Sequence, residues 1–319
     1  MSRGASIALL GLFMACFSSA MSAHASTSTE DNDERGLTVL RTISHDPTSF
    51  TQGLELEDGV ILESTGLFGH SKLRELNKSS GETTNQVEIS DLFFAEGITV
   101  FEDKIVMLTW KSEVALIFDR TSFSIIGNYS FQGQGWGICY DGTHLITSNG
   151  SSELSFRNPG TFQVNHSVRV VHSGSNLELI NELECVDGTI FANVWKQNHI
   201  FAINSSSGIV EYTVNASSIA SNHGETINEV LNGIAYDEEN DAFWLTGKNW
   251  SKLYLVQFPR DSYPENSSGI SPSNHSQSSH FSDTVSLAVL SIIVIIVLRS
   301  LVYQPSPPVS DAANGQEVK

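Results

Sequence analysis

Apolar and polar positions in the middle of the chain recur in short runs at a nearly constant spacing. Five segments share a motif in which aliphatic and polar positions alternate, and their first residues lie 44, 40, 46 and 50 positions apart. These first residues are Gln52, Glu96, Trp136, Glu182 and Asn232. Each segment is followed by runs rich in β-branched and aromatic residues, which predict short antiparallel strands. The chain therefore contains an internal repeat, and the repeat decides the fold.

Four strands in each repeat of ~45 residues are typical of a β-propeller blade. The first four repeats carry four predicted strands, whereas the fifth ends after its third strand, at Phe258. Residues 37–43 precede the first repeat and can supply the missing strand, which would close the ring and remove its exposed edges. We therefore predict an all-β fold, a five-bladed β-propeller over residues 37–259. A two-sheet sandwich is the alternative, but it does not require four strands at this period five times.

The two ends of the chain differ in composition from the repeats. Residues 1–25 combine Arg3 with a short apolar run and a final Ala-His-Ala, which predicts a cleaved secretory signal peptide rather than a short anchor. Residues 26–36 predict an acidic, disordered lead. Residues 260–283 are rich in Ser, Asn and Pro and predict a flexible stalk.

A second apolar stretch, residues 284–303, reaches the ~20 residues that a membrane-spanning helix needs. A glycolipid-anchor signal is the competing interpretation, but such signals normally end with their apolar tail, and the polar residues 304–319 follow here. We expect a single C-terminal transmembrane helix and a cytoplasmic tail of residues 304–319. The propeller would then lie in the secretory pathway, facing the lumen or the cell exterior.

The excess of acidic over basic side chains argues against one class of function, nucleic-acid binding. The chain has 36 acidic and 17 basic side chains, a formal net charge of -19, which argues against a nucleic-acid partner.

Asn-x-Ser/Thr sequons are frequent, as in exported glycoproteins. They begin at Asn77, Asn128, Asn149, Asn165, Asn204, Asn215, Asn249, Asn266 and Asn274.

Cys139 and Cys185 occupy equivalent positions in neighbouring repeats. We expect their side chains to point the same way around the ring, and therefore expect no disulfide between them. Three cysteines in the whole chain support neither a disulfide framework nor a cysteine-rich zinc site. The histidines are scattered without the paired spacing of a zinc site, and the nucleophile-elbow, phosphate-loop and dinucleotide-binding motifs are absent.

The repeats share their scaffold and differ at two rings of positions. Gly recurs at 53, 97, 137 and 233, and the position before it differs in every repeat. The ends of the second predicted strands differ as well: Thr65, Trp110, Asn149, Trp195 and Lys248. Inner strands line the channel of a propeller, so both rings are expected near one mouth, where three matched tryptophans would build an apolar pocket. Blade four departs from the scaffold at Leu183 and Glu184, which points weakly to Asn181 and Glu182.

Residues 44–258 as a whole resemble the plant and bacterial type of glutaminyl-peptide cyclotransferase. The resemblance rests on motifs that occur in order along the chain: His45-Asp-Pro-Thr-Ser-Phe-Thr-Gln-Gly53, Glu63-Ser-Thr-Gly-Leu-Phe-Gly69, Phe94-Ala-Glu-Gly97, Leu108-Thr-Trp110, Gly135-Trp-Gly137, Asn181-Glu-Leu-Glu184, Ala192-Asn-Val-Trp195, Leu231-Asn-Gly-Ile234 and Thr246-Gly-Lys-Asn-Trp250. It implies a five-bladed propeller that converts the N-terminal glutamine of peptides or proteins to pyroglutamate and releases ammonia. It implies neither a metal nor another cofactor.

Carried over residue by residue, the resemblance implies that Glu96 is the proton shuttle and that Asn181 and Lys248 polarise or hold the substrate. It implies a pocket of six further side chains: Phe50, Gln52, Phe94, Trp110, Trp136 and Trp195. Lys252 competes with Lys248 for the lysine position, and Lys248 is preferred because it aligns with Trp110 and Trp195 at the strand ends.

The chain departs from the family pattern at two positions. Asn149 stands where the family usually has Asp, and Ser251 where it usually has Pro. The first change removes a charge and puts the pH dependence and substrate preference in doubt. A catalytically silent surface propeller that binds peptides or glycans remains the alternative function.

Overall fold

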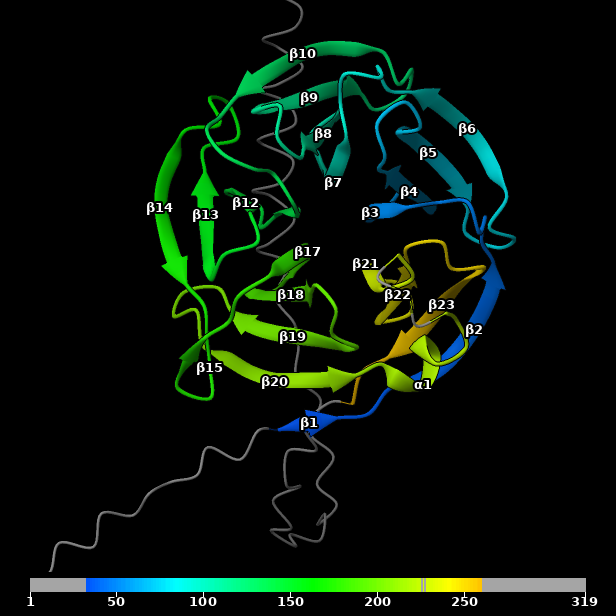
Figure 1. The fold of residues 1–319 in the computed structure, drawn as a ribbon, viewed down its shortest axis with the longest axis vertical. Coiled ribbons are helices and arrows are strands. Elements are labelled where there is room, and N and C mark those ends of the chain that lie inside the picture. The colour runs from blue at the N-terminus through cyan, green and yellow to red at the C-terminus, as the bar shows by residue number, and fades with distance from the viewer. Residues whose placement is uncertain (1–32, 225, 227, 260–319) are drawn as a thin grey trace, which may run out of the picture. The chain divides into compact units, whose positions relative to one another are not determined.

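The computed structural model describes residues 33–259, apart from 225 and 227, and arranges them as a ring of five blades around a central channel (Figure 1). Each blade contains four antiparallel strands, and the sheet of blade four gains a short fifth strand in parallel at its outer edge. The prediction of an all-β, five-bladed propeller is therefore confirmed. In blades one to four the innermost strand comes first in the sequence and the outermost comes last.

The strands of the five blades have the following bounds. Blade one contains β3 (Thr51–Glu57), β4 (Val60–Thr65), β5 (Lys72–Asn77) and β6 (Thr83–Glu88). Blade two contains β7 (Ala95–Phe101), β8 (Lys104–Thr109), β9 (Val114–Asp119) and β10 (Ile125–Ser130). Blade three contains β11 (Ile138–Tyr140), β12 (Leu145–Thr147), β13 (Glu153–Arg157) and β14 (Val164–Arg169). Blade four contains β17 (Ile180–Val186), β18 (Thr189–Val194), β19 (His199–Asn204) and β20 (Val210–Asn215). Blade five contains β21 (Leu231–Asp237), β22 (Ala242–Gly247), β23 (Lys252–Gln257) and β2 (Thr38–Ser44).

Four short elements lie outside these twenty strands. They are β1 (Glu34–Arg35), β15 (Val171–His172), β16 (Ser175–Asn176) and the single-turn helix α1 (Ser217–Ala220).

Blade five is assembled from both ends of the domain. Strand β2 pairs antiparallel with β23, with Val39 opposite Val256 and Ile43 opposite Leu253. The predicted closure by residues 37–43 is therefore confirmed. Because this pairing joins the first blade strand in the sequence to the last, it closes the ring and covers the sheet edge that β23 would otherwise expose.

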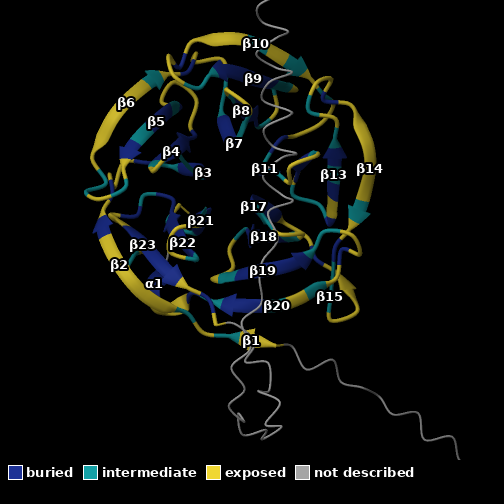
Figure 2. Ribbon diagram, turned by 180° about the vertical axis from the view of Figure 1, so that it is seen from behind, coloured by how far each residue is buried: buried dark blue, intermediate teal, exposed yellow. Residues whose placement is uncertain are grey.

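Burial decreases from the channel outwards (Figure 2). The second strands of the blades are almost fully buried, as in β4 and β8, whereas the outermost strands β6, β10 and β14 are largely exposed. Apolar side chains of neighbouring blades pack into shared clusters, one of which joins blades four and five around Trp250 and Phe243. Burial of apolar area between blades is the main favourable term that holds such a ring together.

The repeated glycines allow the inner strands to approach one another closely. A Cβ at Gly97 would lie 2.7 Å from the carbonyl oxygen of Trp136, and one at Gly53 would lie 2.5 Å from the amide nitrogen of Ile98. The Gly97 amide in turn donates to the Trp136 carbonyl at 2.7 Å. A side chain at either glycine would therefore push neighbouring blades apart, which is why the position recurs.

The expectation that Cys139 and Cys185 stay unpaired was wrong. The two residues form a disulfide, with their Cα atoms 5.5 Å apart. They lie on β11 and β17, the inner strands of blades three and four, which are in contact. Inner strands converge on the channel axis, so equivalent positions of adjacent blades come within the 4.4–6.8 Å range that a disulfide spans.

The prediction that residues 26–36 form a disordered acidic lead was also wrong at the C-terminal end of that range. Glu34 and Arg35 form β1, which pairs in parallel with β20, and the Arg35 guanidinium lies over the Tyr212 ring at 3.7 Å. The predicted signal peptide, stalk, transmembrane helix and tail lie outside the described residues. Within the described part of the chain, no helix has the length and apolar character needed to cross a membrane.

Candidate active site

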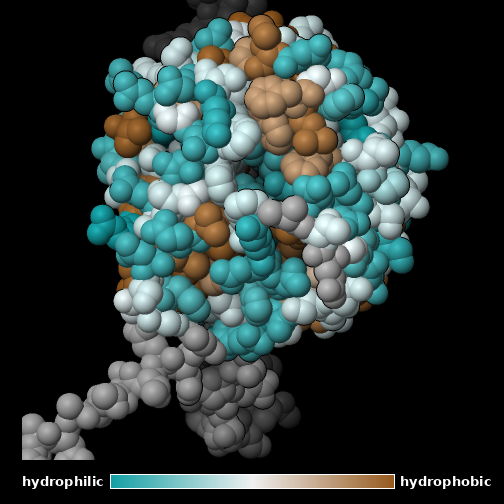
Figure 3. All heavy atoms as spheres, in the orientation of Figure 1, coloured by the Kyte–Doolittle hydropathy of each residue, from teal (hydrophilic) through white to brown (hydrophobic). Residues whose placement is uncertain are grey.

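A cavity of about 290 Å³ opens at one mouth of the channel. All nine site residues expected from the sequence line it, together with Leu67 and Asn228. The face shown in Figure 3 is hollowed near its centre, with hydrophobic side chains gathered beside the hollow. The cavity is large enough for a single amino-acid side chain and the backbone groups attached to it.

The pocket residues of the inner strands sit at β-bulges. The register of β3 shifts at Gln52, that of β7 at Glu96 and that of β17 at Asn181. A bulge leaves an extra residue out of the ladder and redirects its side chain. The same local irregularity in blades one, two and four therefore directs different side chains into one cavity.

The two rings proposed from the repeats contribute only in part. Gln52, Glu96 and Trp136 of the first ring line the cavity, but Glu182 and Asn232 do not. The fully buried Glu182 side chain accepts backbone hydrogen bonds from Leu54 (3.3 Å) and Ile234 (2.9 Å), and so joins three blades. The Asn232 amide donates to the Thr51 carbonyl at 3.0 Å. Both side chains thus form hydrogen bonds between blades instead of lining the cavity.

In the second ring, Trp110, Trp195 and Lys248 line the cavity, whereas Thr65 and Asn149 do not. Asn149 is exposed, and its Oδ1 accepts the amide and hydroxyl of Ser151 at 3.0 and 2.6 Å. The departure from the family pattern at this position therefore lies outside the cavity wall.

Glu96 and Lys248 form an electrostatically coupled pair within the pocket. Burial raises the pKa of the Glu96 carboxyl to about 8, although the charge of Lys248 acts in the opposite direction. Burial lowers the pKa of the Lys248 ammonium, which Glu96 partly offsets. A carboxyl with a pKa near 8 can both accept and return a proton close to neutral pH.

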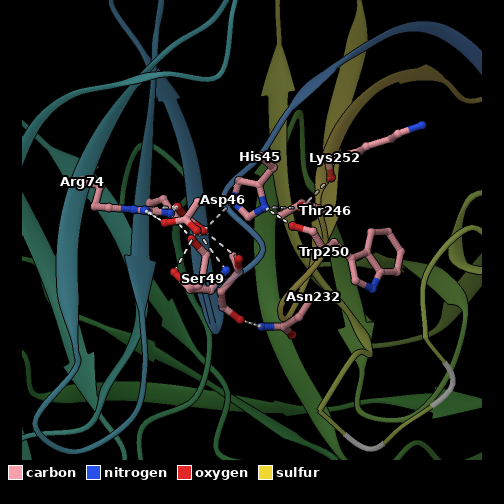
Figure 4. A network of polar contacts seen from close by, with 11 residues as sticks. His45, Asp46, Ser49, Arg74, Asn232, Thr246, Trp250 and Lys252 are labelled. Carbon is pink, nitrogen blue, oxygen red and sulfur yellow. Dashed lines mark hydrogen bonds and ion pairs between the residues drawn. The ribbon is translucent and has the colours of Figure 1, made fainter.

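The competing lysine is placed elsewhere. Lys248 is 6% exposed and its Nζ lies 4.7 Å from the centre of the Phe50 ring. Lys252 is exposed, and Figure 4 shows its side chain directed away from the network around His45. Of the two, only Lys248 lines the cavity.

Aromatic rings build the walls in two groups. Phe94 contacts Phe50 at 6.2 Å and Trp110 at 5.6 Å between ring centres, and Trp136 contacts Trp195 edge-on at 6.2 Å. Gln134 joins the groups, because its Oε1 accepts the indole N–H of Trp110 at 2.7 Å and that of Trp136 at 3.2 Å. The two indoles are therefore held by one side-chain oxygen.

Asn181 presents an unused acceptor. Its Oδ1 is buried and has no hydrogen-bond partner among the described residues. Its backbone carbonyl, in contrast, accepts the hydroxyl of Ser148 at 2.6 Å. An unpaired buried acceptor costs about 1–3 kcal/mol, so a substrate N–H would relieve a cost that is already present in the folded protein.

A buried polar network around His45 and Arg74 (Figure 4) includes Thr51, which lies between the pocket residues Phe50 and Gln52 in the sequence. Glu63 receives hydrogen bonds from Thr51 (2.6 Å) and Arg74 (2.5 Å) and contacts His45 Nε2 at 2.9 Å. Burial disfavours the ionised form, yet His45 and Arg74 together hold the pKa of Glu63 at about 2. His45 Nδ1 also lies 2.7 Å from the carbonyl of Trp250. The network thus ties blade one to the turn that follows Lys248.

Leu67 and Asn228 are pocket residues that the sequence reasoning missed. Both are exposed loop residues, outside the strand ends on which that reasoning relied. Leu67 lay within the motif Glu63–Gly69, which was a usable signal. Asn228 lies between blades four and five, and no repeat or motif marked it.

Comparisons with known proteins agree with this geometry. The family model described as glutamine cyclotransferase matches residues 10–258. A glutaminyl-peptide cyclotransferase from Arabidopsis thaliana is 30% identical over 229 residues, which cover 70% of this chain and 72% of the relative. The crystal structure of the glutaminyl cyclase of Myxococcus xanthus superposes with a TM-score of 0.67 at 30% identity, covering 72% of this chain and 98% of that one. The chain therefore belongs to the glutamine cyclotransferase family.

Proposed function

We propose that the chain is a glutaminyl cyclase, which converts the N-terminal glutamine of peptides or proteins to pyroglutamate. The observation that carries the proposal is the convergence of Glu96, Asn181 and Lys248 in one aromatic pocket of a protein of this family. The pocket is apolar apart from these groups, Gln52 and Asn228, which suits a small uncharged side chain.

The reaction needs orientation and one proton transfer. The α-amine attacks the side-chain carbonyl carbon, a C–N bond forms, and the bond to the amide nitrogen breaks to release ammonia. One proton leaves the amine and one reaches the departing nitrogen, so no net proton is consumed. The aromatic walls would hold the side chain folded towards the amine, which replaces a random search by a near-attack geometry.

Glu96 is assigned the proton transfer. Its pKa of about 8 is close to that of a free α-amino group, about 7.7–8.0. Transfer between groups of similar pKa costs little free energy in either direction. Lys248 and the Asn181 side chain are assigned to the substrate: the ammonium would stabilise the developing oxyanion, and the free Asn181 Oδ1 would accept a substrate N–H.

Ammonia release from Gln-Ala by the purified full-length chain tests the proposal. We expect turnover by the wild type and a loss of about 10²–10⁴-fold in kcat for Glu96→Gln. Glu153→Gln is the matched control, because Glu153 is exposed on β13. Lys248→Met is expected to lose activity, and its control Lys252→Met to retain it. A folded wild type without turnover would leave the silent binding propeller as the better interpretation, and full activity in Glu96→Gln would refute the assigned mechanism.

We also propose that the propeller is exported and anchored by residues 284–303. The Cys139–Cys185 disulfide supports export, because disulfides persist in oxidising compartments. The sequon residues Asn77, Asn128 and Asn165 are exposed, as glycan attachment requires. Glycosidase treatment should shift the protein to lower apparent mass, and alkaline carbonate should leave it in the membrane fraction. Extraction by carbonate would refute the anchor, and an unchanged mass would refute glycosylation.

A further inference from the structure

The loop between β4 and β5 places two apolar side chains at the rim of the pocket. Leu67 is 40% exposed and lines the cavity, and Phe68 is 52% exposed. Phe68 packs its ring edge-on against Phe94, a pocket wall, with 5.5 Å between ring centres. These two side chains, called here the rim ledge, therefore extend the aromatic wall out to the solvent.

Two hydrogen bonds and a close contact with Phe94 fix the loop that carries the rim ledge. The Gly66 amide donates to the Phe50 carbonyl at 2.8 Å, and the Leu67 carbonyl accepts the hydroxyl of Ser71 at 2.9 Å. Gly66 lies directly against Phe94, since a Cβ there would be 2.7 Å from the ring atom Cζ. The loop is thus fastened to the same segments that carry the pocket residues.

Leu67 adopts a backbone conformation that its side chain disfavours. Its φ of 86° lies in the left-handed region, where glycine is the usual residue. Such a conformation costs on the order of 1–3 kcal/mol and persists where the surroundings enforce it, often at ligand sites. A ligand that contacts Leu67 and Phe68 would account both for the strained backbone and for the exposure of the two apolar side chains.

Two of the pocket tryptophans differ from the rim ledge in what covers them. Lys111 lies over the Trp110 ring at 3.9 Å, and Lys196 lies over the Trp195 ring at 4.3 Å. Those indoles are covered by cations, whereas the rim ledge has open apolar surface. A peptide that leaves the pocket along blade one would meet this surface with its next side chain.

We propose that the rim ledge is the subsite for the residue that follows the N-terminal glutamine, and that it selects an apolar side chain there. The proposal rests on the proposed function, because the occupant is the continuation of the same substrate. An apolar contact of this kind is worth about 10-fold or more in kcat/KM.

The test uses Gln-Phe-amide and Gln-Gly-amide with the wild type, Phe68→Ala, Phe68→Leu and Ile126→Ala. Ile126 is 56% exposed on the outermost strand β10 and is the matched surface control. We expect the wild type and Ile126→Ala to prefer Gln-Phe-amide about 10-fold, Phe68→Ala to reduce that ratio to about 2 or less, and Phe68→Leu to restore most of it. Equal kcat/KM for both peptides in the wild type, or an unchanged ratio in Phe68→Ala, would overturn the subsite.

Calorimetric binding of the same two peptides separates this proposal from the function itself. If the wild type binds Gln-Phe-amide more tightly and Phe68→Ala does not, the subsite stands even when no ammonia is released. Turnover of both peptides with no difference in kcat/KM or in affinity would remove the subsite and leave the cyclase function intact.

Discussion

The hydroxyl of Ser64 donates a 2.6 Å hydrogen bond to the backbone carbonyl of Glu96. Ser64 lies on β4 of blade one, and Glu96 lies at the bulge of β7 in blade two, where the register with β8 is interrupted. The bond therefore satisfies the Glu96 carbonyl at the point where the strand pairing is interrupted. It also lets blade one position the proposed proton shuttle of blade two. The hydroxyl of Ser148 in blade three donates to the backbone carbonyl of Asn181 in blade four in the same way.

Ser64→Ala should displace Glu96 without altering its chemistry. Loss of a buried hydrogen bond leaves the carbonyl unpaired, at a cost of about 1–3 kcal/mol, so we expect kcat to fall about 10-fold and the free energy of unfolding to fall by a similar 1–3 kcal/mol. Steady-state kinetics and urea denaturation measure the two effects. Ser122→Ala, on an exposed turn, is the control. An unchanged kcat in Ser64→Ala would show that the bond does not position Glu96.

Gln134 should act on substrate binding through the two indoles that it holds. Gln134→Leu removes the shared acceptor, and we expect KM to rise about 5- to 10-fold while kcat changes less, since a neutral hydrogen bond contributes about 0.5–1.5 kcal/mol. Gln134→Glu keeps an acceptor oxygen and should retain a KM near that of the wild type. Gln132→Leu, an exposed neighbour, is the matched control. Equal KM values in Gln134→Leu and the wild type would contradict the positioning role.

The pH dependence of activity should report the ionisation of Glu96. The carboxyl accepts a proton only when ionised, and its pKa is about 8, so kcat/KM should rise with pH through about 8. Lys248 lowers the pKa of Glu96, and Lys248→Met should therefore move the acidic limb of the residual activity to higher pH. The substrate amine is the same in both profiles, so the difference isolates the enzyme group. If the acidic limb of Lys248→Met lies at the same pH as that of the wild type, the titration belongs to a group other than Glu96.

The Cys139–Cys185 disulfide should contribute substantially to stability. It links positions 46 residues apart, for which loop-closure entropy predicts about 4 kcal/mol. We expect the double variant Cys139→Ser/Cys185→Ser to unfold at a lower urea concentration, with the free energy of unfolding reduced by about 2–4 kcal/mol. Reduction of the wild type should produce the same shift and should not affect the double variant. Identical midpoints before and after reduction would contradict this contribution.

Much of the fold could be predicted from the local pattern of apolar and polar residues. The strand alternation, the repeat period and the short fifth repeat predicted five blades and the closing role of residues 37–43, and the structure confirms them. These features are visible because inward and outward positions alternate along each strand, and because each repeat must bury the same faces. The nine pocket residues were also named beforehand, but their roles came from a family resemblance rather than from spacing.

The errors share a physical cause, which is that they concern contacts between segments that are separated in the sequence. Whether Cys139 meets Cys185, and whether Glu182 faces a ligand or the amides of Leu54 and Ile234, depends on how far the inner strands converge. Spacing along one strand carries no information on that convergence. The position of Leu67 at the rim likewise depends on the fastening of its loop to Phe50.

The number of blades, their order and the chemical types available at the channel could be predicted from the pattern of residues along the chain. Three features depend on the folded ring: which of those side chains share one cavity, the burial that raises the pKa of Glu96 to about 8, and the extension of the pocket to the surface by Leu67 and Phe68. The division follows from the range of the forces involved. Strand patterning is local, whereas desolvation and the meeting of bulges from several blades exist only once the ring has closed.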